Sequence, residues 1–169
     1  MRAVLVTNGQ GRPAPSCIRV VPLPDGFACF LHHRGATGLE LAANPGVSLA
    51  FDWPEQGRTV VATGRCGRLS AVDSDAFFGG LAEREQLAVW AGGEQRENMS
   101  RAAAAGAFAD FADYFSGQLI PRPQKWGGYR IAVDEMRFQQ ESDDGVTDSF
   151  RYGKTAAAGD WYAVRTPPL

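Results

Sequence analysis

The sequence is poor in the residues that mark metal centres, disulfide scaffolds and nucleic-acid-binding proteins. Its 169 residues include two histidines and three cysteines, and the formal net charge is -2. The cysteines, Cys17, Cys29 and Cys66, are odd in number and widely spaced, which predicts neither a disulfide framework nor a metal site. A nucleic-acid partner is not expected either, because neutralising phosphates needs a concentrated basic face.

Long apolar runs are also missing. Stretches such as residues 47–51 are far shorter than the roughly 20 residues that span a bilayer, and residues 1–7 turn polar too soon for a secretory signal peptide. We therefore expect no membrane association and a reducing, cytoplasmic location. Hydrophobic residues make up 44% and charged residues 21%, which is the balance of one globular domain over residues 1–169.

Turn residues divide the first third of the chain into short strands. Residues 3–7, 17–23 and 27–31 are rich in apolar residues. Asn8-Gly9 follows the first run and Pro24-Asp25-Gly26 separates the second from the third, and Asn-Gly between apolar runs is a strong hairpin signal. The chain is therefore predicted to open as an antiparallel meander.

A short helix is predicted after the meander, because the apolar residues of 39–42 lie at helical spacing and Asn44-Pro45 stops the pattern. Thr37 is the expected N-cap of this helix. Two further strands, at residues 47–53 and 59–63, follow and continue the sheet.

The middle third of the chain is predicted to be helical. Ser70 followed by Asp73 resembles a capping box. A longer helix is predicted over residues 98–115, where three phenylalanines share one side and are expected in the core. Four short strands complete the chain, at residues 127–133, 136–140, 147–152 and 161–165. Strands, helices and strands in one chain indicate the α+β class.

Several strings of the sequence resemble one family. Pro121-Arg122-Pro123-Gln124-Lys125-Trp126-Gly127-Gly128-Tyr129 is similar to the Pro-x-Pro-x-x-Trp-Gly-Gly-Tyr signature of the pyridoxamine 5'-phosphate oxidases. Gly38-Leu39-Glu40-Leu41-Ala42-Ala43-Asn44-Pro45 is similar to their Gly-x-Glu-Leu-x-x-Asn-Pro block. Further matches fall in the same order at compatible spacings: Gly11-Arg12-Pro13, Ser74-Asp75-Ala76-Phe77-Phe78, Ala88-Val89-Trp90 and Phe150-Arg151-Tyr152.

The resemblance implies an antiparallel split β-barrel with flanking helices, assembled as a homodimer with FMN in a cleft between the subunits. In this family the flavin oxidises an amine or alcohol and passes electrons to oxygen. The positions implied for the cofactor are Ser16, or Arg19 if the strand register slips, together with Phe30, Thr37, Thr59, Gln95, Gln139 and Ser149. The positions implied for the substrate are Phe77, Leu81 and Thr147.

The cations expected at these positions are missing. Gly35-Ala36-Thr37-Gly38 stands where the family has Ser-Arg-Lys-Gly, which removes both cations expected to hold the FMN phosphate. Leu81 replaces the arginine that would hold the substrate phosphate, and Phe77 replaces a tyrosine. Because a buried phosphate needs charged, hydrogen-bonding partners, authentic pyridoxamine 5'-phosphate oxidase activity is not expected.

Two interpretations follow from these departures. In one, the protein is a diverged flavoenzyme that oxidises a small secondary metabolite and holds FMN through backbone amides and hydroxyls, with Arg19 or Arg34 supplying charge. In the other, the protein is flavin-free and its cleft binds a metabolite or haem, as a cofactor-independent catalyst or as a binding module. The chain also begins at the first strand, without the helical extension that commonly precedes it in the family. A more open cleft for a larger or less polar substrate is therefore expected.

The only two histidines, His32 and His33, stand at the end of the third predicted strand. Since neighbouring strand residues face opposite ways, one of them is expected to point into the cleft as a general acid or base, or as a haem ligand. Glu94 is a further catalytic candidate. Four residues are instead expected to be structural and buried: Trp126, Tyr129, Cys17 and Cys29.

Overall fold

The computed structural model describes residues 1–93, 100–155 and 159–167. Along the chain the elements are β1 (Arg2–Thr7), β2 (Ala14–Leu23), β3 (Gly26–His32), α1 (Ala36–Ala43), β4 (Gly46–Trp53), η1 (Pro54–Gln56), β5 (Arg58–Arg68), α2 (Ala71–Gly79), α3 (Glu83–Ala91), α4 (Arg101–Tyr114), β6 (Trp126–Glu141), β7 (Thr147–Lys154) and β8 (Trp161–Arg165). Strands at both ends with helices between them confirm the predicted α+β class.

The chain divides into two compact units. The barrel unit comprises residues 1–29, 40–67 and 130–169, and the helical unit comprises residues 30–39 and 68–129.

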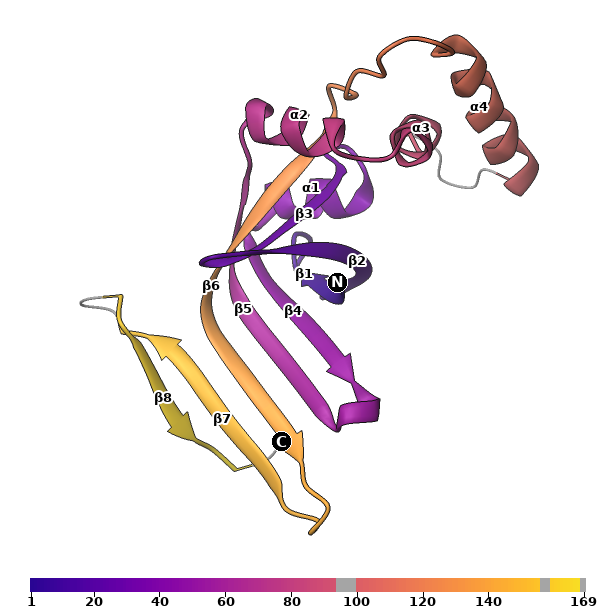
Figure 1. The fold of residues 1–169 in the computed structure, drawn as a ribbon. Helices are drawn as coiled ribbons and strands as arrows, with labels where there is room; N and C mark the ends of the chain where they lie inside the picture. The colour runs from indigo at the N-terminus through magenta and orange to yellow at the C-terminus, as the bar shows by residue number, and fades with distance from the viewer. Residues whose placement is uncertain (94–99, 156–158, 168–169) are drawn as a thin grey trace. The chain divides into compact units, whose positions relative to one another are not determined.

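The barrel unit is built on one antiparallel sheet with the strand order β3-β2-β1-β4-β5-β6-β7-β8 (Figure 1). An additional pairing of β3 with β6 closes the first six strands into a barrel, while β7 and β8 continue beyond β6. The first hairpin pairs β1 with β2 from Arg2 opposite Arg19 to Thr7 opposite Ala14. This pairing confirms the hairpin predicted from Asn8-Gly9. The architecture is therefore an antiparallel split β-barrel with added helices.

The core of the barrel unit follows the two-residue period of its strands. Leu5 of β1 lies directly opposite Leu49 of β4, and both side chains are fully buried. Leu49 in turn lies opposite Ala62 of β5, which is also buried. Because alternate residues of a strand share a face, this inward row continues through Phe51 to Trp53, whose rings stack at 5.8 Å.

The close approach of β5 and β6 explains why one position of β5 is a glycine. A Cβ atom on Gly64 of β5 would lie 2.0 Å from the carbonyl oxygen of Ala132 in β6. Only a residue without a side chain permits that approach.

In the helical unit, serine N-caps begin two helices. The Ser70 hydroxyl accepts a hydrogen bond from the Asp73 N–H at 3.0 Å at the start of α2, and the Ser100 hydroxyl accepts one from the Ala103 N–H at 3.1 Å at the start of α4. The Ser70 hydroxyl also donates to the Asp73 carboxylate at 2.7 Å, so the predicted pairing of these two residues is confirmed. Trp90 of α3 contacts the rings of Phe111 and Phe115, which joins α3 to α4.

Several details differ from the sequence-based expectations. The strands predicted at 127–133 and 136–140 form one continuous strand, β6. The charged residues between them do not end it, because β6 has solvent-exposed positions that accept charged side chains. Thr37 is not an N-cap: α1 already includes Ala36, and the Gly35 carbonyl accepts from the Leu39 N–H at 3.0 Å. Residues 98 and 99 of the predicted long helix lie outside the described residues.

Two further differences concern burial. Cys17 is exposed rather than buried, because it lies opposite the exposed Val4 on the outer side of the β1–β2 hairpin. Of the three phenylalanines expected in the core, Phe115 is buried, whereas Phe108 and Phe111 are half-buried. Trp126, Tyr129 and Cys29 are buried as predicted.

Candidate functional site

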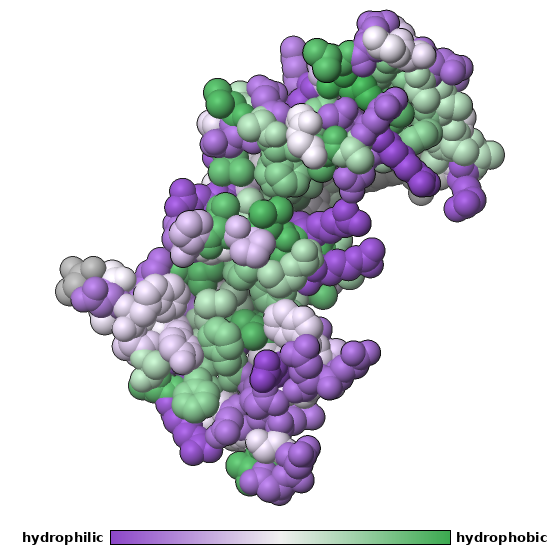
Figure 2. Space-filling view, viewed as in Figure 1, coloured by the Kyte–Doolittle hydropathy of each residue, from purple (hydrophilic) through white to green (hydrophobic). Residues whose placement is uncertain are grey.

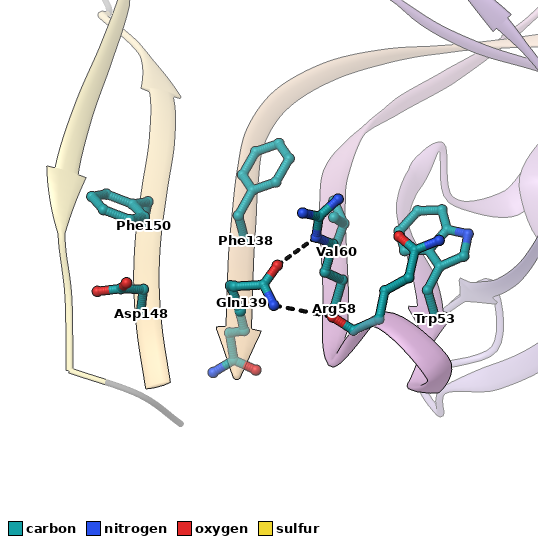
Figure 3. A pocket seen from close by; sticks show the side chains of 9 residues that line it. Trp53, Arg58, Val60, Phe138, Gln139, Asp148 and Phe150 are labelled. Carbon is teal, nitrogen blue, oxygen red and sulfur yellow. Dashed lines mark hydrogen bonds between the residues drawn. The ribbon is translucent and has the colours of Figure 1, made fainter. Parts of the chain in front are cut away.

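The barrel unit contains a pocket of about 420 Å³, which we call the barrel pocket (Figure 3). It opens beside the end of β4, the start of β5 and the hairpin of β6 and β7. Its lining residues are Trp53, Gln56, Arg58, Val60, Phe138, Gln139, Gln140, Asp148 and Phe150.

Aromatic side chains form the apolar walls of the barrel pocket. Trp53 comes from β4, Phe138 from β6 and Phe150 from β7. Phe138 lies directly opposite Phe150 in the β6–β7 register, and its ring meets that of Tyr152 edge-on at 5.2 Å. Walls of this kind suit a planar, apolar ligand body, because aromatic faces and edges contribute large contact areas.

Polar groups lie along one side of the same pocket. The Arg58 Nε donates a hydrogen bond to the Gln140 side-chain oxygen, and the Gln140 amide donates to the Gln56 carbonyl at 3.0 Å (Figure 3). Asp148 is paired with Arg165 of β8. The guanidinium of Arg58 is thus held at the pocket by its neighbours, where it can bind a ligand carboxylate through further N–H groups.

The other face of these strands carries the residues that the resemblance assigned to the cofactor. Gln139 borders the barrel pocket, but strand alternation places its side chain with that of its pairing partner Ser149. Ser149 is buried and its hydroxyl shares a hydrogen bond of 2.9 Å with the Thr166 hydroxyl. The Thr59 hydroxyl donates to the Asp52 carboxylate at 3.2 Å.

The remaining barrel-unit candidates lie on other strands or strand ends. Arg19 is exposed opposite Arg2, and Ser16 lies opposite the buried Leu5. Thr147, the substrate candidate, begins β7 opposite Glu141. The structure therefore brings Gln139 and Ser149 together. It leaves Arg19, Ser16 and Thr147 at separate places in the sheet register.

In the helical unit, both histidines have partners within the protein. The His32 Nε2 lies 3.1 Å from the Val89 carbonyl oxygen of α3, and because a carbonyl only accepts, the ring donates from Nε2. The His33 Nδ1 lies 3.0 Å from the Tyr129 hydroxyl. The two rings thus contact different elements, and each helps to hold its strand end; their catalytic role stays a prediction.

His32 also borders a second, smaller pocket of about 340 Å³ within the helical unit. The lining residues are His32, Val89, Trp90, Gly93, Pro123, Gln124 and Lys125. Its lining is mostly apolar side chains and backbone, so it offers less polar specificity than the barrel pocket.

Two predicted ligand-binding residues of the helical unit pack against one another. The rings of Phe30, a cofactor candidate, and Phe77, a substrate candidate, stack with centroids 3.5 Å apart and 6° between their planes. Phe30 also stacks on Trp126 at 5.6 Å. Leu81 follows α2 and is half-buried. This aromatic cluster is the immediate environment of the Trp-Gly-Gly-Tyr motif.

The resemblance to the family assigns the FMN phosphate to the first turn of α1. Ala36, Thr37 and Gly38 stand at the start of the helix, where the helix dipole attracts anions. A Cβ on Gly38 would lie 2.5 Å from the His32 carbonyl oxygen, so this turn is packed closely on the end of β3. Thr37 adds a hydroxyl, and the exposed Arg34 stands two residues before the helix. These residues fit a phosphate held by backbone and hydroxyl groups.

Glu94 and Gln95 lie outside the described residues. Among the residues that the structure does describe, no group of three or more histidine, cysteine or acidic side chains is placed to hold a metal ion. Burial raises the pKa of the Cys29 thiol and of the Cys66 thiol to about 12 each. Neither thiol is therefore suited to act as a nucleophile at neutral pH.

The sequence reasoning missed most of the barrel pocket. Arg58, Phe138 and Phe150 were not singled out as site residues, although the apolar alternation of Met136 and Phe138 and of Phe150 and Tyr152 was visible. What the alternation did not reveal was which strands lie beside each other.

Comparison with known proteins agrees with the fold. A crystal structure of PhzG from Burkholderia lata 383, in complex with tetrahydrophenazine-1-carboxylic acid, matches 99% of this chain and 82% of its own with a TM-score of 0.89 and 24% identity. A pyridoxamine 5'-phosphate oxidase-related, FMN-binding protein from Nostoc punctiforme matches 99% of this chain and 88% of its own with a TM-score of 0.81 and 13% identity. The fold is that of the FMN-binding split barrels.

Sequence relatives identify the family within that class. The pyridoxine/pyridoxamine 5'-phosphate oxidase of Salinispora arenicola is 36% identical over 94% of this chain and 72% of its own length. That of Rubrobacter xylanophilus is 31% identical over 94% of this chain and 73% of its own. No family model matches the chain. The chain belongs to the pyridoxine/pyridoxamine 5'-phosphate oxidase family.

No helix in the described part of the chain has the length and apolar character needed to cross a membrane.

Proposed function

We propose that this protein is an FMN-dependent oxidoreductase that acts on a planar, carboxylate-bearing secondary metabolite, and that it is not an authentic pyridoxamine 5'-phosphate oxidase. The observation that carries the proposal is the barrel pocket, in which aromatic walls meet a single positioned guanidinium, that of Arg58. Family membership and the split-barrel fold support flavin as the cofactor.

The residues that would hold FMN are those of the α1 first turn, with Thr37 donating its hydroxyl and Arg34 contributing charge. Bound FMN would supply acceptance of two electrons and their transfer onward to oxygen. The chain's own residues would bind and orient the substrate. His32 keeps its Nε2 proton on the Val89 carbonyl, so proton transfer at that atom would require this bond to break.

The substrate class follows from what the pocket offers and what the phosphate positions lack. Leu81 and Phe77 give no cation for a substrate phosphate, whereas Arg58 in the barrel pocket can pair with a carboxylate. The PhzG structure contains a ligand of this chemical kind, a ring system bearing one carboxylic acid. A planar ring acid is therefore a better fit than a pyridoxine phosphate.

We also propose that the protein works as a homodimer. Exposed apolar side chains gather on β7 and β8, where Phe150 and Tyr152 are each 38% exposed and Trp161 is 46% exposed. Figure 2 shows green and pale side chains along this side of the barrel unit, bordered by purple ones. A continuous apolar face of this kind is typical of a protein interface, and a second copy is the partner that a symmetric assembly supplies.

Spectroscopy of the purified protein tests the cofactor. The expected result is a yellow protein, or a colourless one that becomes yellow when FMN is added and the excess is removed, with flavin bands at about 370 and 450 nm. Oxygen uptake with a panel of reduced ring acids should then exceed that with pyridoxine 5'-phosphate.

Two outcomes would refute the proposal. One is a protein that neither retains nor takes up FMN, which would favour the flavin-free interpretation. The other is efficient oxidation of pyridoxine 5'-phosphate, which would show that its phosphate is bound without the family's arginine.

A further inference from the structure

We propose that Gln140 is a positioning residue that decides which charge the barrel pocket accepts. Its amide holds the Arg58 guanidinium without neutralising it, so the guanidinium can still pair with a ligand carboxylate. The inference rests on the proposed function, because it names the residue behind the carboxylate preference of the same pocket. It does not depend on flavin, since ligand binding to this pocket can be measured with or without FMN.

Gln140 lies in the middle of the polar side of the barrel pocket. It stands on β6 opposite Asp148 of β7, two residues from Phe138, which lies opposite Phe150. Because residues two apart on a strand share a face, the Gln140 side chain lies on the same side of the sheet as these aromatic walls. Arg58 contacts it from β5, the neighbouring strand on the other side of β6. The amide therefore lies between a cation and a carboxylate.

The hydrogen bonds of the Gln140 amide favour one orientation of this group. Its Nε2 donates to the Gln56 carbonyl at 3.0 Å and to the Glu141 carbonyl at 2.8 Å, and a primary amide has two N–H groups to donate. Its oxygen accepts from the Arg58 Nε. In the flipped orientation the amide oxygen would face two carbonyl oxygens, and the amide nitrogen would face another donor. The Arg58 Nε therefore meets a neutral acceptor.

Arg58 keeps its positive charge available, whereas the other arginine near the pocket does not. Arg165 forms an ion pair with Asp148. Among the described residues, no carboxylate lies within ion-pair distance of Arg58. An arginine has five N–H groups, and the bond to Gln140 uses the one at Nε. The terminal N–H groups can therefore donate to both oxygens of a ligand carboxylate, which is the geometry that a guanidinium favours.

Carboxylates near Gln140 give this positioning its importance. A hollow of about 600 Å³ lies between the turn that joins β4 to β5 and the β6–β7 hairpin, and Gln140 lines this hollow as well as the barrel pocket. The acidic residues of the hollow are Glu55, Glu141 and Asp143. Because opposite charges attract one another over several ångströms near a protein surface, a guanidinium released from the amide would be drawn toward these carboxylates. Gln140 therefore keeps Arg58 at the barrel pocket.

Two substitutions separate the effect of charge from that of hydrogen bonding. Gln140→Glu keeps the size of the side chain, but a carboxylate would neutralise Arg58 and could not donate to the two backbone carbonyls. Gln140→Met adds no charge and removes the hydrogen bonds, so Arg58 loses its orientation but not its charge. The control is Gln10→Glu, which makes the same change of charge at an exposed residue of the barrel unit outside the pocket.

Calorimetry of the purified proteins measures binding of 1-naphthoate and of the neutral 1-naphthamide. We expect Gln140→Glu to weaken naphthoate binding about fivefold and Gln140→Met about threefold. Naphthamide binding should not change in either variant, which also shows that the pocket is still folded, and Gln10→Glu should bind both ligands as the wild type does. In an Arg58→Gln background, Gln140→Met should cause no further loss of naphthoate binding, because Gln140 acts through Arg58.

Equal losses for the acid and the amide would overturn the inference, since Gln140 would then act by shaping the pocket. A further loss from Gln140→Met in the Arg58→Gln background would overturn it as well. If Gln140→Glu does not fold, as circular dichroism would show, Gln140→Met and its combination with Arg58→Gln still decide the question.

The measurements also separate this inference from the proposed function. A wild-type preference for naphthoate that survives both substitutions of Gln140 refutes the inference alone. A wild type that shows this preference, loses it on substitution of Gln140 and binds no FMN supports the inference and refutes flavin as the cofactor. A wild type that binds acid and amide equally refutes the inference together with the carboxylate preference of the proposed function.

Discussion

At the scale of single residues, Arg58 is the side chain that gives the barrel pocket its chemical preference. It is the cation among the lining residues, and its Nε is bound to Gln140. Because a guanidinium binds a carboxylate more strongly than a neutral amide, charge on the ligand should decide how much this residue contributes.

We therefore expect Arg58→Gln to weaken binding of 1-naphthoate by roughly 2- to 5-fold, because an exposed ion pair contributes up to about 1 kcal/mol. Binding of the neutral 1-naphthamide should not change. Calorimetric titration of both ligands measures the difference. The control is Arg65→Gln on the same strand, outside the pocket. Equal losses for acid and amide would mean that Arg58 acts by packing alone.

The three cysteines provide a second prediction at this scale. Cys17 is exposed, whereas burial raises the pKa of Cys29 and Cys66 from 9.0 to about 12. Only the thiolate reacts with alkylating agents. At pH 8 iodoacetamide should therefore modify Cys17 alone in the folded protein and all three cysteines in denaturant. Mass spectrometry of peptides gives the sites, and rapid modification of Cys29 under native conditions would contradict the buried environment.

The same thiols link stability to pH. Their pKa is raised in the folded state, so the folded protein keeps these protons after the unfolded chain has lost them. The contribution to stability is present below pH 9.0 and is lost as the pH rises from there through about 12.

Burial of individual residues was predictable where the local pattern was strong, and residue type alone was an uncertain guide: it was right for Cys29 and wrong for Cys17. Trp126 and Tyr129 stand in a motif whose glycines permit close packing, and both are buried. Cys17 was predicted to be buried from its residue type alone. Its exposure depends on which side of the β1–β2 hairpin faces the core. A shift of one residue along the strand would turn its side chain to the opposite face.

At the scale of elements, glycine at one position of β5 permits the strand to pair with β6. A Cβ on Gly64 would meet backbone atoms, the Ala132 oxygen at 2.0 Å, whereas a Cβ on Gly67 of the same strand would meet nothing within 4 Å. Backbone atoms cannot move aside as the end of a flexible side chain can.

Gly64→Ala should therefore lower the free energy of unfolding by roughly 2–4 kcal/mol, because the strands must separate to admit the methyl group. The matched Gly67→Ala should change it by less than about 1 kcal/mol. Urea denaturation followed by circular dichroism measures both. Similar stabilities for the two variants would show that β5 and β6 are not held at this separation.

Turn and cap signals made most elements predictable, while long-range effects set their ends. The Asn8-Gly9 hairpin and the Ser70 cap formed as expected because each depends on a few adjacent residues. Asp134 and Glu135 were expected to end a strand. Instead β6 continues, with Glu135 opposite Gly153 and ion-paired to Arg137, so pairing with β7 outweighs the local polarity.

At the scale of the whole molecule, the fold was predictable, whereas the barrel pocket was not. The Trp-Gly-Gly-Tyr string and its accompanying blocks indicated the split barrel, and both fold and family are confirmed. The barrel pocket needs Trp53 and Phe150 to meet across strands almost 100 residues apart in sequence. Only the strand order supplies that information, and no local pattern contains it.

Dimerisation through the apolar face of β6, β7 and β8 is a property of the whole molecule. Tyr152 and Trp161 border a hollow of about 330 Å³ on the apolar face of β6, β7 and β8. A second subunit that covers this face would bury both rings, and aromatic residues at the centre of an interface contribute about 2 kcal/mol or more each. An acidic side chain at either position would also place an unpaired charge in the interface.

The wild-type protein should therefore sediment as a dimer at micromolar concentration, whereas Tyr152→Glu and Trp161→Glu should each weaken dimerisation at least about 30-fold. The control is Leu119→Glu, because Leu119 is 96% exposed and lies outside this face. Analytical ultracentrifugation over a range of concentrations gives the dissociation constants, and circular dichroism verifies the fold of each variant. If the wild type is monomeric, or if all three variants dimerise equally well, the β7–β8 face is not the subunit interface.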